Sequence, residues 1–310
     1  MSNYFESPRT IEQAYENGLV GSYCNKEELD QLLGELKHPL FSIAAHNLYG
    51  TGEGKISLPF KSLLKFDPGF GPAEAQKTGD CVSHSTRNAV DISRAVEIDN
   101  GEAEDFVGRS ATEAIYGHRG HRGQGMSCGR AAKFVSSVGG ILIRKKYSFA
   151  DLSRYNAQIG MNWGGRGVPR EVLQEAVKHQ VKTVSMVHTV EAARDAIANG
   201  YAISVCSSQG FSNTRDKNGI ASPRGSWAHA MAWIGCDDSR ELFNETLFLV
   251  QNSWGIWNSG PLRLGQPEGS FWIRESVARR MLAADGSFVF SNIDGFKPRK
   301  LDYSVLGSFL

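Results

Sequence analysis

The residue whose type and position most directly suggest chemistry is Cys81, within the stretch "QKTGDCVSHSTRNAVD" at 76–91. It follows a Gly-Asp pair and opens a run with helical apolar spacing, so we expect it at a helix N-terminus. A thiol attacks as the thiolate, and both a helix N-terminus and a nearby imidazole lower the pKa of a thiol. The alternative is a small buried cysteine that merely begins a helix. Chemistry at Cys81 therefore requires a histidine from elsewhere in the chain.

His229 is the best placed of the eight histidines. It stands at the entry of an expected strand in "GSWAHAMAWIGC", where small Ala228 and Ala230 leave room for a cysteine or a substrate. Asn252 ends a later apolar run, "LFLVQNSWGIW". Its side-chain carbonyl can accept a hydrogen bond from the second ring nitrogen of His229, and Trp254 can keep water off that bond. Taken alone, Asn252 is more simply a turn former.

The remaining histidines suggest less. His118, His121 and Cys128 form an H-x2-H-x6-C loop that could hold a metal, but it lacks a fourth ligand and carries interleaved arginines, so we interpret it as a solvated loop. His84 lies one turn into the expected Cys81 helix and should pack in the core or between lobes. The sequence thus predicts neither a metal nor a cofactor.

Composition excludes several classes of partner. The net charge is +1 and the basic residues are scattered, which argues against a nucleic-acid or membrane-surface role. The N-terminus lacks a secretory signal and no apolar run is long enough to span a membrane, so we expect a soluble, cytoplasmic protein. Five widely spaced cysteines favour reduced thiols, with Cys206 and Cys236 as core residues.

The elements that must position these residues follow in a helix-then-strand order. Residues 1–49 have a Thr10/Gln13 capping box and a segment with leucines at helical spacing, and "GTGEG" at 50–54 is predicted to be a flexible joint. Segment 160–167, "GMNWGGRG", is predicted to be a loop. Helices are expected at 81–96, 128–140, 169–180 and 189–200, and strands at 201–207, 230–236, 246–251, 270–274 and 287–291. This order predicts an α+β protein with a helical lobe and a sheet lobe.

Three ordered blocks, "QKTGDCVSHS", "WAHAMAWIGCDD" and "LVQNSWG", carry a family pattern. With them the chain resembles the papain-like cysteine proteases, the papain and cathepsin type of thiol peptidase, over about residues 55–290. The resemblance implies a two-lobe fold with a cleft between a helical lobe (about 75–165) and an antiparallel sheet or barrel lobe (about 180–292). It divides the chain into an arm (1–54), a peptidase domain (55–292) and a tail (293–310).

The resemblance also implies roles. Cys81 is the nucleophile, His229 the general base and then acid, and Asn252 the group that orients His229. The Cys81 backbone N–H and the Gln76 side chain form the oxyanion hole. The substrate is a polypeptide, hydrolysed through a thioester without a cofactor.

By the same resemblance, five residues contact the substrate: Gly125, Met126, Trp227, Ala230 and Trp254. Gly125, Met126, Trp227 and Ala230 would line the pocket for the side chain second from the cut. Bulky Trp227 would narrow that pocket and favour modest apolar side chains.

The chain also departs from the family pattern. Gln76-x4-Cys81 is one residue short, Val82 replaces an aromatic residue, and Cys128 lacks its usual partner and is expected to be unpaired. The arm is either a short inhibitor of the cleft or a docking element for a larger assembly. Two alternatives to an endopeptidase therefore stay open. One is a scaffold component of an assembly such as a phage particle, which would associate the protein with a virion. The other is an enzyme acting on a different amide, such as a peptidoglycan cross-link. Such signal-free relatives are expected from prokaryotic or phage genomes.

Overall fold

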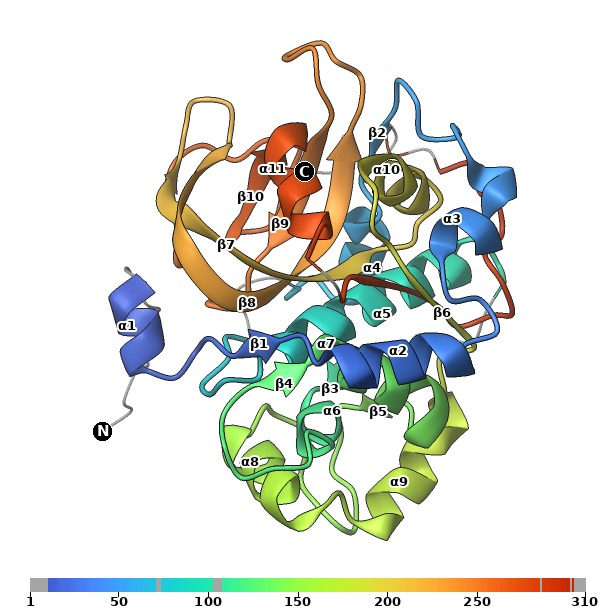
Figure 1. The fold of residues 1–310 in the computed structure, drawn as a ribbon, viewed down its shortest axis with the longest axis vertical. Coiled ribbons are helices and arrows are strands. Elements are labelled where there is room, and N and C mark those ends of the chain that lie inside the picture. The colour runs from blue at the N-terminus through green and yellow to red at the C-terminus, as the bar shows by residue number, and fades with distance from the viewer. Residues whose placement is uncertain (1–10, 71–73, 103–107, 285, 302, 304–310) are drawn as a thin grey trace.

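The computed structural model describes residues 11–70, 74–102, 108–284, 286–301 and 303. The first ten residues of the predicted arm, and residues 302 and 304–310 of the predicted tail, lie outside the described residues. The molecule has a sheet lobe and a helical lobe, with helix α5 (Cys81–Asp99) running between them (Figure 1). The predicted α+β class with two lobes is confirmed.

Helix α5 is the central element of the core. It begins directly after Asp80 and ends at Asn100, where Gly101 takes a φ of +70° that favours glycine. Every residue from Cys81 to Glu97 is buried, because α5 packs against strands of the sheet on one side and against helices of the other lobe. The helix predicted to start at Cys81 is therefore present.

One open, mainly antiparallel sheet of seven strands forms the other lobe. Its order is β10-β9-β8-β7-β11-β6, with β2 added to β8. The strands are β2 (Ile56–Ser57), β6 (Thr183–Met186), β7 (Ile203–Arg215), β8 (Ala221–Asp237), β9 (Leu247–Gln251), β10 (Ser270–Arg274) and β11 (Phe288–Ser291). All five predicted strand segments are found. Within the described residues β6 and β10 end the path without pairing to each other, so the barrel alternative is wrong.

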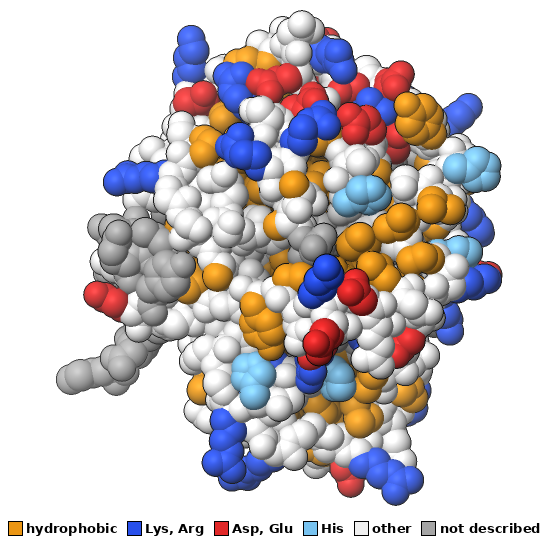
Figure 2. Space-filling view, in the orientation of Figure 1, with side chains coloured by type: hydrophobic (Ala, Val, Ile, Leu, Met, Phe, Trp, Pro, Cys, Tyr) orange, Lys and Arg blue, Asp and Glu red, His pale blue; other side chains and the backbone are white. Residues whose placement is uncertain are grey.

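Helices cover both lobes. The sheet lobe carries α10 (Val190–Ala198) and α11 (Glu275–Leu282). The helical lobe contains α6 (Glu113–Gly117), α7 (Cys128–Lys133), the π-helical turn η2 (Phe134–Val138), α8 (Ala157–Arg166), α9 (Arg170–Ala176), η3 (Val177–His179), and strands β3 (Ser110–Ala111), β4 (Met126–Ser127) and β5 (Leu142–Ile143). None of the helices in the described part of the chain is long and apolar enough to cross a membrane. Basic and acidic side chains are interspersed on the face shown in Figure 2.

Helix α8 corrects the prediction that residues 160–167 form a loop. Asn156 caps this helix by accepting a hydrogen bond from the Gln158 backbone N–H. Gly160 and Gly164 are buried one turn apart, on the face that receives the Arg119 guanidinium. Arg119 donates to the Gly160 carbonyl at 2.8 Å, so these glycines serve close packing rather than a turn.

The N-terminal segment packs on both lobes. It comprises α1 (Ile11–Glu16), β1 (Ser22–Tyr23), α2 (Lys26–Glu35), α3 (Phe41–Ala44) and η1 (His46–Leu48), and α4 (Phe60–Phe66) follows β2. Leu29 and Leu32 join the core beneath α5, whereas Phe41 and Leu48 join the core of the sheet lobe. Strand β1 runs parallel to β4, between the two lobes (Figure 1). The division of the chain at residue 54 stays a prediction.

A disulfide joins Cys128 on α7 to Cys206 on β7, with the two Cα atoms 6.5 Å apart. The expectation of an unpaired, reduced Cys128 is therefore wrong, whereas Cys206 is a core residue as predicted and also forms the disulfide. The two residues are 78 positions apart, and only the packing of α7 against the sheet brings them together. The disulfide ties the helical lobe to the sheet lobe. Of the other cysteines Cys24 is exposed, while Cys81 and Cys236 are free thiols in the interior.

Candidate active site

Helix α5, which begins at Cys81, packs against β8, which carries His229. The Ala230 backbone N–H acts on the Cys81 thiol and lowers its pKa, so the residue that follows His229 is part of the surroundings of the thiol. Within the described residues, His229 Nδ1 is buried and has no hydrogen-bond partner.

The tautomer of His229 is set by Asn252. His229 Nε2 lies 2.8 Å from Asn252 Oδ1, and the Ser253 backbone N–H donates to the same oxygen at 2.7 Å. An amide oxygen can only accept, so Nε2 carries the proton in the neutral ring. The lone pair is therefore on Nδ1, the ring nitrogen left without a hydrogen-bond partner. This is the arrangement that a general base needs.

Aromatic rings cover the histidine. The Trp254 ring lies 4.6 Å from the His229 ring and is 1% exposed. Trp227 packs on Trp254 at 4.9 Å. Trp227 belongs to the core of the sheet lobe, whereas Ala230 belongs to the core around Cys81. That these two residues contact the substrate stays a prediction.

Gln76 lies at this site despite the short spacing to Cys81. Its backbone N–H donates to the Ser253 carbonyl at 2.8 Å, and its side-chain oxygen accepts from the Ser253 hydroxyl at 2.5 Å. The side-chain Nε2 donates to the Leu19 carbonyl at 2.9 Å and to the Thr78 carbonyl at 2.7 Å. The loop from 76 to 80 is tight, as its Asp80 N–H to Thr78 carbonyl bond of 2.8 Å shows.

Residues 19–23 pass through the site as an extended segment. The Leu19 carbonyl accepts from Gln76 Nε2 and, at 3.3 Å, from Trp254 Nε1. The Gly21 N–H donates to the Ala228 carbonyl at 2.7 Å, and the Gly21 carbonyl accepts from the Met126 N–H at 2.8 Å. The segment is therefore bound to both lobes on either side of Cys81 and His229.

Two glycines permit this close approach. Gly21 has a φ of +151°, and a Cβ added to it would lie 2.7 Å from the Gly125 Cα. Gly125 has a φ of +84° and faces the Gly21 backbone in turn. Gly125 and Met126, both predicted to contact substrate, thus contact residues 19–23 of the chain itself. With this segment in place, both Cys81 and His229 are 0% exposed.

Burial keeps both groups uncharged. Loss of solvent raises the pKa of the Cys81 thiol to about 12, although the Ala230 N–H opposes the shift. Loss of solvent lowers the pKa of His229 to about 4, against the opposing hydrogen bond to Asn252. With residues 19–23 in place, the site therefore holds a neutral thiol beside a neutral imidazole.

The alternative metal loop is not assembled. His118 packs against the Phe134 ring, His121 Nε2 lies 3.2 Å from the Tyr23 hydroxyl, and Cys128 is in the disulfide. Within the described residues, no group of three or more His, Cys, Asp or Glu side chains is placed to bind a metal.

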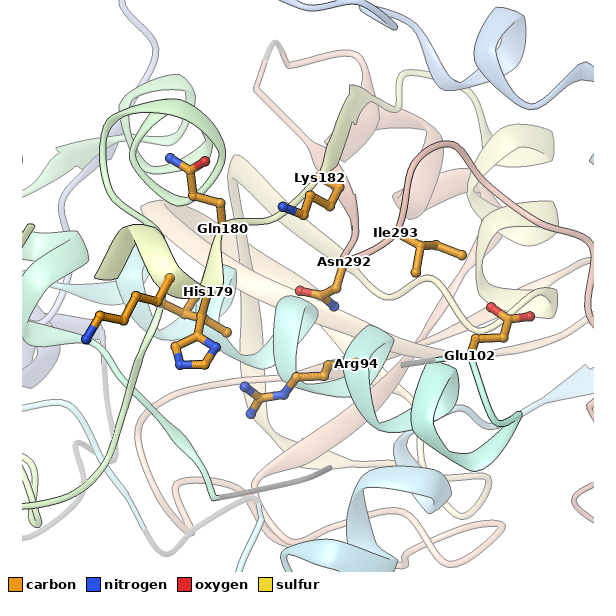
Figure 3. Close-up of a pocket in the computed structure, with 9 residues that line it drawn as sticks. Arg94, Glu102, His179, Gln180, Lys182, Asn292 and Ile293 are labelled. Carbon is orange, nitrogen blue, oxygen red and sulfur yellow. The ribbon is translucent and has the colours of Figure 1, made fainter. Parts of the chain in front are cut away.

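A cavity of about 290 Å³ lies apart from this site, with Arg94, Glu102, His179, Lys182 and Asn292 among its lining (Figure 3). The Arg94 guanidinium is bound by Asp91, and Glu102 is bound by Arg299. These charges are already matched within the protein, so we assign this cavity no part in the chemistry.

Several residues at the site were not predicted from the sequence. Gln124 Oε1 accepts from the Thr78 hydroxyl at 2.5 Å and from the Gly79 N–H at 2.7 Å, which fixes the loop before Cys81. Tyr155 donates to Asp80. His84 was expected in the core and is buried there, with Nε2 3.4 Å from Asp80 Oδ2. The i,i+4 spacing of Asp80 and His84 was the one local signal for these contacts.

Comparison with known proteins adds the fold. No family model and no curated protein matches the chain. Among solved structures, proCathepsin B S9 from Trypanosoma congolense has a TM-score of 0.53 at 12% identity, covering 96% of this chain and 92% of that one. Xylellain, a cysteine protease from Xylella fastidiosa, has a TM-score of 0.49 at 13% identity, covering 94% and 95%. The chain has the fold of the papain-like cysteine proteases.

Proposed function

We propose that the protein is a cysteine peptidase in which Cys81 is the nucleophile, His229 the general base and Asn252 the group that orients it. The observation that carries the proposal is the binding of residues 19–23. An extended peptide lies between the lobes, with hydrogen bonds to both walls and a carbonyl oxygen on Gln76 Nε2. A site that binds its own backbone in this way is suited to a polypeptide substrate.

The residues supply each step of amide hydrolysis. The Cys81 proton moves to His229 Nδ1, and the sulfur attacks the carbonyl carbon. The Gln76 side chain and the Cys81 backbone N–H stabilise the oxyanion. His229 then protonates the leaving amine as the C–N bond breaks. Water, deprotonated by His229, hydrolyses the thioester, releasing the carboxylic acid and restoring the thiol.

Residues 19–23 support the inhibitor interpretation of the arm over the docking interpretation. They occupy the Gln76 donor that an oxyanion would need, and the Cys81 thiol is fully buried while they are bound. The resting protein is thus closed, and activity requires this segment to leave the cleft. We assign the inhibitory role to residues 19–23 alone.

The test is covalent labelling with an epoxide thiol-protease inhibitor, followed by peptide mass spectrometry. The wild type and Gly21→Ala are each incubated with the inhibitor, with Cys81→Ala and His229→Ala as matched controls in the Gly21→Ala chain. We expect an adduct on Cys81 that is strongest in Gly21→Ala and lost in the His229→Ala control, together with hydrolysis of a peptide library. Absence of any Cys81 adduct in both chains would leave the scaffold alternative as the better one.

A further inference from the structure

The loop between Gln76 and Cys81 has a second support that reaches the active site from outside it. The Tyr155 hydroxyl donates to Asp80 Oδ2 at 2.8 Å and accepts from the Lys77 backbone N–H at 3.1 Å. The Tyr155 side chain therefore binds both ends of the loop, Lys77 next to the proposed oxyanion donor Gln76 and Asp80 next to Cys81.

The Asp80 side chain has unusual hydrogen-bond partners for a residue at a helix N-cap. It occupies the N-cap of α5, where an aspartate normally accepts from the first-turn N–H groups, yet its side chain makes no capping hydrogen bond. The first turn is capped instead by the Asp80 backbone carbonyl, which accepts from Ser83 N–H at 2.9 Å. The carboxylate is turned toward Tyr155 and His84 and is 1% exposed. Within the described residues, its Oδ1 has no hydrogen-bond partner.

We propose that Tyr155 is a positioning residue for the Cys81 reaction, because it holds the Asp80 carboxylate away from the N-terminus of α5. This inference rests on the proposed function. A released carboxylate has an alternative partner at the first-turn N–H groups, the usual place for an N-cap aspartate. There its negative charge would oppose the Cys81 thiolate and the oxyanion that share this end of the helix.

The charged and titratable groups around the Asp80 carboxylate come from several elements. They are His84 and Cys81 on α5, Tyr155 before α8, Tyr116 on α6, and Arg119 directly after α6. Glu74, Arg87, Arg144 and Glu113 form a separate ion-paired cluster nearby. His84 Nε2 lies 3.4 Å from the carboxylate but, within the described residues, makes no hydrogen bond, so the hydrogen bond from Tyr155 is what holds the carboxylate.

The test replaces Tyr155 by Phe in the full-length Gly21→Ala chain. Tyr147→Phe is the matched control, since Tyr147 lies in the same segment and donates one hydrogen bond, to the Ile143 carbonyl at 2.8 Å. We expect Tyr155→Phe to lower kcat about tenfold with KM changed less than twofold, and to shift the midpoint of Cys81 alkylation by iodoacetamide about one pH unit upward. Tyr147→Phe should change neither.

A third chain separates positioning from simple destabilisation. In Tyr155→Phe with Asp80→Asn, the released side chain carries no charge, so the upward shift of the alkylation midpoint should vanish. Retention of the shift in that chain, or equal effects of the two Tyr→Phe substitutions, would overturn the inference. Failure of Gly21→Ala itself to give a reactive Cys81 would instead refute the proposed function, and alkylation reports this without any substrate.

Discussion

Gly21→Ala is the substitution that most directly opens the closed site. The added Cβ would lie 2.7 Å from the Gly125 Cα and 3.1 Å from its backbone nitrogen, at a φ of +151°. Because the atoms that clash with this Cβ belong to the backbone of Gly125, they cannot rotate away as a side chain could, so residues 19–23 must shift. A non-glycine residue in such a conformation costs about 1–3 kcal/mol, and loss of the two Gly21 backbone hydrogen bonds adds about 1 kcal/mol each.

Together these terms destabilise the closed state by roughly 3–5 kcal/mol, which corresponds to an open population at least about a hundredfold larger. The assay is the rate of Cys81 alkylation by iodoacetamide, followed by peptide mass spectrometry, with exposed Cys24 as an internal reference. Because alkylation requires an open site, its rate should rise by about the same factor.

Gly34→Ala is the matched control for this assay. It adds the same methyl group to the chain, on α2, where a Cβ would meet nothing within 4 Å. The rate at Cys81 should be unchanged in this variant. Equal Cys81 rates in Gly21→Ala, Gly34→Ala and wild type would refute the idea that residues 19–23 seal the thiol.

Three further predictions follow from the burial and cross-links of the site. The unfolded chain protonates His229 near pH 6.5 and the closed chain near pH 4, so the free energy of unfolding should fall by roughly 3 kcal/mol as pH drops from 7 to 4. Urea unfolding at several pH values checks this, and His229→Gln should remove that part of the slope; an unchanged slope would contradict it. Replacing both Cys128 and Cys206 by Ala should lower the free energy of unfolding by about 4 kcal/mol, given the 78-residue loop that the disulfide closes, whereas Cys24→Ser should leave it unaltered. Replacing Asn252 by Ala in the Gly21→Ala chain should reduce kcat by at least about tenfold, because the tautomer of His229 is no longer fixed. An unchanged kcat, relative to the Gly21→Ala chain that keeps Asn252, would show that the hydrogen bond has no catalytic role.

The sequence was sufficient for the parts of the site that short motifs encode. Cys81 at the start of α5 and the strands that carry His229 and lead to Asn252 each follow from local spacing, and the structure shows these elements. The hydrogen bond between His229 and Asn252 joins residues 23 positions apart, and the order of the motifs was enough to anticipate it.

The predictions that were wrong concern contacts between segments that are distant in the sequence. Cys128 and Cys206 carry no local sign of pairing, because their approach is set by α7 meeting β7. Gly160 and Gly164 were predicted to lie in a loop, because the side chains that pack beside them, Tyr116 on α6 and Arg119 directly after α6, are distant in the sequence.

The step that separates a cysteine peptidase from an inactive scaffold is formation of a thioester between the Cys81 sulfur and a bound acyl group. It is tested most directly by acid-quenching the Gly21→Ala protein during turnover of a peptide nitrophenyl ester and mapping the acyl mass by peptide mass spectrometry. We expect a hydroxylamine-sensitive acyl group on the peptide containing Cys81, absent from Cys81→Ala and much reduced in His229→Ala. An acyl group found only on other residues, or none under conditions where the ester is turned over, would contradict it.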